Sequence, residues 1–110
     1  MLLERDIQKQ ILNYCSHQKY IEVWRNNTTG IWDQKKGRYR LNRSKHARKG
    51  ISDILGVTNT GRFLAIEVKS KYGKLTEHQN EFLQMVANMG GIAIVARSLE
   101  DVVTAFGSIF

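Results

Sequence analysis

The stretch FLAIEVKS (63–70) reads as a buried β-strand that carries two charged residues. Side chains alternate between the two faces of a strand, so Glu67 and Lys69 fall on one face, while Leu64 and Ile66 fall on the other. An ionised side chain inside a protein is costly unless it is paired or bound to a metal ion. One explanation is a structural salt bridge between Glu67 and Lys69, which accounts for these two charges and no others. The other explanation is that the two residues belong to a functional site.

A third charged residue reaches the same face from the preceding strand. The stretch GISDILGV (50–57) also reads as a strand, and the glycine-containing NTG that follows it reads as a hairpin turn. If the chain turns near Thr60, Asp53 lies opposite Glu67. Adjacent carboxylates repel each other, and Mg²⁺ or Mn²⁺, which prefer hard oxygen ligands, would remove that repulsion. Lys69 would then orient a nucleophilic water or stabilise charge on a phosphate.

Hydrophobic periodicity predicts an α/β fold in which a mixed four-stranded sheet is flanked by helices, in the order αβββαβα. Thr76 and Ser98 are predicted N-caps of the second and third helices. The short apolar strand 92–96 is typical of a parallel strand covered on both faces, which makes the sheet mixed. The expected helices are 2–17, 77–89 and one from 99, and the expected strands are 21–25, 50–57, 62–69 and 92–96.

The positive charge of the chain is concentrated in one segment. The net charge is +7, and eight of the seventeen basic residues lie within 35–49, which contains no acidic residue. The rest of the chain has nine basic and ten acidic residues. This segment predicts contacts with phosphate groups, and a solvated loop is the alternative. The basic residues are Lys35, Lys36, Arg38, Arg40, Arg43, Lys45, Arg48 and Lys49.

Length and composition favour a single domain, 1–110, with the basic segment as a loop or hairpin insertion at about 30–49, turning near Gly37. The N-terminus is charged within four residues and therefore does not resemble a secretory signal. The longest apolar run, 92–96, is too short to cross a bilayer. The single cysteine, Cys15, fits a reducing compartment, so we expect a cytoplasmic protein.

The spacing SD, thirteen residues, EVK is similar to the signature of the PD-(D/E)XK nuclease superfamily, with Ser52 where a proline often stands. More specifically, GISDILG followed by FLAIEVKSKYGKLTEHQNEFL resembles the VRR-NUC (virus-type replication-repair nuclease) family. The resemblance covers almost the whole chain. It implies a restriction-endonuclease-like core and a nuclease of a bacterial or phage-infected cell.

The resemblance also assigns roles to individual residues of the predicted site. It implies that Asp53, Glu67 and the backbone carbonyl of Val68 bind the metal ion, and that Lys69 is the catalytic lysine. Glu4 matches an acid that many superfamily members use to complete the metal site. A solvent-exposed glutamate that favours the helix start is the alternative for Glu4.

Gln79 matches the glutamine of the family motif. It also forms the pattern T-x-x-Q with Thr76, which predicts a capping box. Its spacing from Phe82, Leu83 and Val86 places it on the sheet-facing side of the helix, in favour of a role in the site.

Several other residues have open interpretations. Trp24 and Trp32 are candidates for stacking on bases, and packing in the core or on the hairpin is the favoured alternative. Lys71, Tyr72 and Lys74 follow the EVK motif, where they would touch the phosphate backbone or form a solvated loop.

The residues and the resemblance together predict a metal-dependent, structure-specific DNA endonuclease, similar to Holliday junction resolvases. Such an activity implies branched DNA as the partner and a homodimer that places two active sites on it. No pattern for reading bases is present, so recognition would rest on DNA shape. The alternatives are a non-catalytic nucleic-acid-binding module and a restriction-type or RNA-cleaving nuclease.

Overall fold

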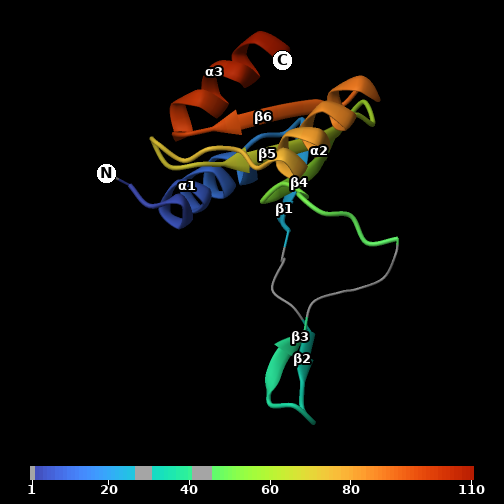
Figure 1. Cartoon of the computed structure of the whole chain (residues 1–110). Coiled ribbons are helices and arrows are strands. Elements are labelled where there is room, and N and C mark those ends of the chain that lie inside the picture. Colours follow the sequence, from blue (N-terminus) through green and yellow to red (C-terminus); the bar gives the residue numbers. More distant parts are fainter. Residues whose placement is uncertain (1, 27–30, 41–45) are drawn as a thin grey trace.

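The structure, a computed structural model, describes residues 2–26, 31–40 and 46–110 and shows a sheet with helices on both faces (Figure 1). The elements are α1 (Glu4–Ser16), β1 (Ile21–Arg25), β2 (Ile31–Asp33), β3 (Arg38–Arg40), β4 (Ile54–Thr58), β5 (Phe63–Val68), α2 (Glu77–Asn88), β6 (Ile92–Ala96) and α3 (Leu99–Ile109). None of the helices in these ranges combines the length and apolar character needed to cross a membrane.

The main sheet has the strand order β1-β4-β5-β6. β1 and β4 are antiparallel, as are β4 and β5, whereas β5 and β6 are parallel and are connected through α2. The sheet is therefore mixed. Apart from the β2–β3 hairpin, the order is αβββαβα, which confirms the predicted fold class.

Alternating side chains of the strands divide the apolar core into two layers. On one face, Ile66 packs in a cluster with Ile11 of α1 and Val102 of α3. On the other face, Ala65 packs with Phe82 of α2. The sheet thus lies between α1 and α3 on one side and α2 on the other, and Glu67 follows Ala65 on the α2 side.

Polar residues define the starts of the second and third helices, as the sequence predicts. Thr76 accepts a hydrogen bond from the backbone N–H of Gln79, and Ser98 accepts one from Asp101. These bonds satisfy backbone donors that have no partner inside the helix. The start of α2 is therefore fixed directly after the loop that leaves β5.

The predicted strand 50–57 is wrong at its beginning, because β4 starts only at Ile54. Gly50 has a φ of 75°, a left-handed conformation that does not fit a strand. A Cβ atom at this position would collide with the backbone of His78 and Gln79, so the chain here packs tightly against the first turn of α2. Asp53 is therefore the residue directly before β4.

The basic segment includes a hairpin separate from the main sheet. β2 and β3 pair antiparallel, with Ile31 opposite Arg40, and Gly37 in the turn has a φ of 63°. Figure 1 shows this hairpin projecting away from the helices and the main sheet. The Cα radius of gyration is 14.9 Å, compared with roughly 13 Å for a compact chain of this length. The basic charge is therefore carried partly outside the compact body.

Candidate functional site

Asp53 and Glu67 are brought together by the register of the β4–β5 hairpin. Ile54 lies opposite Ile66, so the next position along the hairpin places Asp53 opposite Glu67. Asp53 Oδ2 accepts a hydrogen bond of 2.8 Å from the backbone N–H of Val68. The aspartate is thus fixed to the strand that carries the glutamate.

Glu67 is 2% exposed and sits in an unfavourable electrostatic environment. Burial raises the pKa of Glu67 to about 8, and the negative charges of Asp53 and Glu4 act in the same direction. Lys69 opposes this shift of the Glu67 pKa, and its Nζ lies 4.0 Å from Glu67 Oε1. Glu67 Oε2 is buried and has no hydrogen-bond partner within the described ranges. The predicted salt bridge is present, but it does not by itself stabilise the ionised glutamate.

Lys69 is only 9% exposed, which is unusual for a lysine. Its backbone N–H donates to the carbonyl oxygen of Ala96 at 2.9 Å, so the chain still follows β6 one residue beyond the end of β5. This contact keeps the strand-like alternation, and the Lys69 ammonium group is held on the same face as Glu67.

The two carboxylates fit a hard divalent cation. Their oxygens are the ligand type that Mg²⁺ and Mn²⁺ prefer, and the buried Glu67 Oε2 has an unused acceptor position. Among the described residues, no group of three or more His, Cys, Asp or Glu side chains is arranged to hold a metal. Asp53 and Glu67 therefore make up a pair of candidate ligands, to which backbone or water oxygens would have to be added.

Comparison with known proteins identifies the family of the chain and supports its fold. The model of the VRR-NUC domain matches residues 4–100. The chain belongs to the VRR-NUC family. A solved structure described as a VRR_NUC domain protein is 23% identical, with a TM-score of 0.61, over 96% of this chain and 86% of that chain, which supports the same fold. A search of curated proteins found no significant match.

Glu4 reaches the candidate site from the first turn of α1. Its Oε1 accepts a hydrogen bond of 3.3 Å from the backbone N–H of Ser70, the residue after Lys69. Its charge also contributes to the raised pKa of Glu67. Glu4 is exposed at the helix start, as the alternative interpretation required, and its role as a metal ligand stays a prediction.

Gln79 forms the predicted capping box at the start of α2. Its side-chain Oε1 accepts a 2.9 Å hydrogen bond from the backbone N–H of Thr76, and its own N–H donates to Thr76 Oγ1 at 3.2 Å. The structure therefore confirms that Gln79 forms a capping box with Thr76. A role of Gln79 in the chemistry stays a prediction.

The basic residues are spread over the hairpin and its return to the body. Lys35 and Lys36 lie in the turn region, Arg38 and Arg40 belong to β3, and Arg43 and Lys45 lie outside the described residues. The exposed Arg48 places its guanidinium carbon 5.6 Å from the ring centroid of Phe82. Lys49, the next residue in the sequence after Arg48, is also exposed. The cation–π contact between Arg48 and Phe82 attaches the end of the basic segment to α2.

Asn26 is a site residue that the sequence motif does not reveal. Its backbone N–H donates to the carbonyl oxygen of Asp53 at 2.8 Å, which extends the pairing of β1 beside the candidate site. Alternation then places the Asn26 side chain on the face of Asp53 and Glu67. Its Nδ2 is buried and has no partner in the part of the chain described. Only the pairing of β1 with the residues before β4 would have indicated this position.

The favoured interpretation of Trp24 is wrong, because its side chain is 50% exposed and does not pack in the core. Trp24 belongs to the outer strand β1, where it pairs with Leu55 of β4. Figure 1 shows that α2 does not extend over β1. The side chain of Trp32 lies outside the described features.

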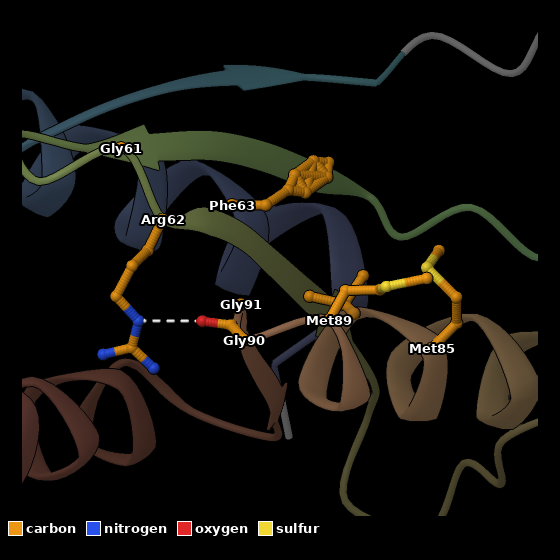
Figure 2. A pocket seen from close by; sticks show the side chains of 8 residues that line it. Gly61, Arg62, Phe63, Met85, Met89, Gly90 and Gly91 are labelled. Carbon is orange, nitrogen blue, oxygen red and sulfur yellow. Dashed lines mark hydrogen bonds between the residues drawn. The ribbon is translucent and has the colours of Figure 1, made fainter.

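An apolar pocket of about 370 Å³ lies beside the turn between β4 and β5, at the end of these strands that is opposite to Asp53 and Glu67 (Figure 2). Phe63, Met85 and Met89 line it, and Arg62 Nε donates to the carbonyl oxygen of Gly90 at 2.9 Å. No carboxylate lines this pocket. It therefore offers no alternative position for the chemistry of the Asp53–Glu67 pair.

Proposed function

We propose that this protein is a divalent-metal-dependent endonuclease that cuts branched DNA. The observation that carries the proposal is the pair of adjacent carboxylates, Asp53 and buried Glu67, beside the almost buried Lys69 in a member of the VRR-NUC family. Bound Mg²⁺ or Mn²⁺ would neutralise the two carboxylates and polarise the phosphate that is attacked. Asp53, Glu67 and the Val68 carbonyl would hold it, with Glu4 as a further candidate.

The residues of this chain would act mainly by position and charge. The Lys69 ammonium group, held near Glu67, can donate a hydrogen bond to the attacking water or to a phosphate oxygen as negative charge develops there. Asp53 is kept in place by the Val68 N–H. The low exposure of Lys69 would strengthen its attraction to a substrate phosphate, and that of Glu67 its attraction to the metal ion, because water screens buried charges less than exposed ones.

DNA binding would depend on the basic segment. The projecting hairpin and the attached end at Arg48 place positive charge on both sides of the connection to the body. We further propose a homodimer, which would present two sites to a four-way junction, in the cytoplasm of a bacterial or phage-infected cell.

The proposal is tested by incubating the purified protein with Mg²⁺ or Mn²⁺ and end-labelled DNA of four kinds: single-stranded, duplex, flap and four-way junction. We expect cleavage that requires the metal, stops in EDTA, and is at least about ten-fold faster on branched than on duplex DNA, the factor that corresponds to roughly 1.4 kcal/mol. Binding without cleavage in either metal would instead identify a non-catalytic module. Preferential cleavage of matched RNA substrates would identify an RNA nuclease.

Replacing Lys35, Lys36, Arg38 and Arg40 with serine is expected to reduce DNA affinity strongly and the cleavage rate at saturating DNA only slightly. Each phosphate contact on duplex DNA contributes about −0.9 to the slope of log affinity against log salt concentration. The slope should therefore become less negative by about two to four units, as measured by fluorescence anisotropy at several salt concentrations. Serine at the exposed Lys9 and Lys19 of the body is the matched control. An unchanged slope would show that the hairpin is only a solvated loop.

A further inference from the structure

The loop 70–75, which connects β5 to α2, begins directly after Lys69 and is held from two sides. On one side, Glu4 accepts the hydrogen bond from the Ser70 N–H. Within the loop, the Gly73 N–H donates to the Ser70 carbonyl oxygen at 3.1 Å. Figure 1 shows this loop, in yellow, beside the start of α1 and the end of β6. Its backbone therefore has a defined shape close to the candidate site.

Arg97, directly after β6, holds the loop from the second side. Its Nη1 donates to the carbonyl oxygens of Ser70, Lys71 and Gly73 at 2.7, 3.3 and 2.6 Å. Hydrogen bonds from a charged donor are stronger than those between neutral groups. Arg97 is itself fixed, because its backbone N–H donates to Asp101 Oδ2 at 2.8 Å. One guanidinium group thus determines the shape of a loop more than twenty residues away in sequence.

This fixed loop presents an aromatic ring to solvent. Tyr72 is 74% exposed, and its ring centroid lies 5.4 Å from the Nζ atom of Lys71. The exposed Tyr20, by contrast, stacks on Phe110 with the ring centroids 6.4 Å apart. Among the described residues, the contact with Lys71 is the only aromatic or cation–π contact that Tyr72 makes. An open ring beside a cation is suited to a flat base that is attached to a phosphate.

Chain length limits how far Tyr72 can lie from the candidate site. Three peptide units separate Tyr72 from Lys69, and consecutive Cα atoms are about 3.8 Å apart, so the two Cα atoms lie within about 11 Å. The two side chains extend beyond their Cα atoms, so a few nucleotides of single strand can connect a base on Tyr72 with a phosphate at Lys69. A base stacked on Tyr72 would therefore belong to a nucleotide near that phosphate.

We propose that the loop 70–75 binds an unpaired DNA base near the bond that is cut. Tyr72 stacks on the base, Lys71 contacts its phosphate, and Arg97 is a positioning residue that keeps the loop in its binding shape. The position relative to the cut bond rests on the proposed nuclease function. The inference narrows the substrate to DNA in which at least one nucleotide near the cleavage site is unpaired.

The test measures binding without cleavage, in EDTA, by fluorescence anisotropy with a short labelled oligothymidylate and a blunt duplex of equal length. Tyr72→Ala is expected to weaken binding of the single strand by about ten-fold, within the range for loss of one base–aromatic stack. Duplex affinity should change less than about two-fold, because the basic segment supplies it. Tyr72→Phe keeps the ring and should bind both probes as the wild type does.

Arg97→Ala is expected to weaken binding of the single strand to the same extent as Tyr72→Ala. The double variant should be no weaker than either single variant, because both changes remove one contact. Tyr20→Ala is the control for loss of an exposed tyrosine at the other end of the sheet, and should leave both affinities unchanged. The melting temperature of each variant separates a loop effect from unfolding.

Unchanged binding of the single strand in Tyr72→Ala, or an equal loss on both probes, would overturn the inference. These results do not depend on catalysis. If the protein binds the single strand through Tyr72 but cuts no DNA, the nuclease proposal fails, and the binding of an unpaired base by the loop stands without a position relative to a cut bond. If it cuts branched DNA and Tyr72→Ala binds normally, the loop assignment fails alone.

Discussion

Replacing Asp53 with asparagine is expected to reduce DNA cleavage by about a thousand-fold, the upper end of the range for loss of one electrostatic contact in an active site. Asparagine has nearly the same shape, and its side-chain oxygen can still accept the hydrogen bond from the Val68 N–H. The charge beside Glu67 is removed without loss of the contact that positions the side chain. Single-turnover cleavage in Mg²⁺ is the measurement, and wild-type activity in this variant would refute the assignment of the site.

The same variant has a second readout in the absence of metal. In the wild type, the pKa of Glu67 is raised to about 8, mainly by burial and then by Asp53. The folded protein therefore holds a proton that the unfolded chain releases at lower pH, so the metal-free stability falls as pH rises from about 4.5 to about 8. Asp53→Asn removes one cause of this shift in the Glu67 pKa.

Thermal unfolding at pH 8 in EDTA should then give a higher melting temperature for Asp53→Asn than for the wild type. Added Mg²⁺ or Mn²⁺ should stabilise the wild type, because an ion that binds only the folded state shifts the equilibrium towards it. The variant should respond much less. Equal stabilisation of both proteins by metal would place the metal site elsewhere, even if cleavage were lost.

Replacing Lys69 with methionine is expected to lower the single-turnover rate by about a hundred- to a thousand-fold, while DNA affinity changes only a few-fold. Methionine keeps the length and apolar character of the buried part of the side chain and removes the ammonium group that lies near Glu67. Affinity should persist, because the eight basic residues between 35 and 49, which are proposed to bind the DNA, are unchanged in this variant.

Lys19→Met is the matched control, since it removes an exposed lysine in the turn between α1 and β1. Its rate and affinity should match the wild type. If Lys69→Met instead loses affinity and keeps its single-turnover rate, Lys69 is a phosphate-binding residue and has no part in the chemical step.

The sequence predicted how the residues of the candidate site are arranged, because local rules determine that arrangement. A tight turn near Thr60 and strand alternation were enough to place Asp53 opposite Glu67 and to put Lys69 on the same face. The capping box at Thr76 follows from four consecutive residues in the same way. These features depend on residues that are close in sequence or joined by one hairpin.

The contacts that the sequence did not predict join distant parts of the chain. Nothing near Arg97 indicates that its guanidinium group binds carbonyl oxygens of the loop after Lys69. The start of β4 was placed too early because GISD has strand-like composition, whereas Gly50 packs against α2 in a left-handed conformation. The exposure of Trp24 depends on its place in an outer strand, which the strand order of the folded sheet decides.

The hydrogen bond between the Asn26 N–H and the Asp53 carbonyl has a consequence for how this domain can diversify. The two ends of the connection between β1 and β4 meet there, so the chain leaves the sheet and returns to the same place. The cost of closing such a loop grows only slowly with its length. Related chains can therefore exchange long and short connections at this position, with different surface charge, while the Asp53–Glu67 pair keeps its geometry.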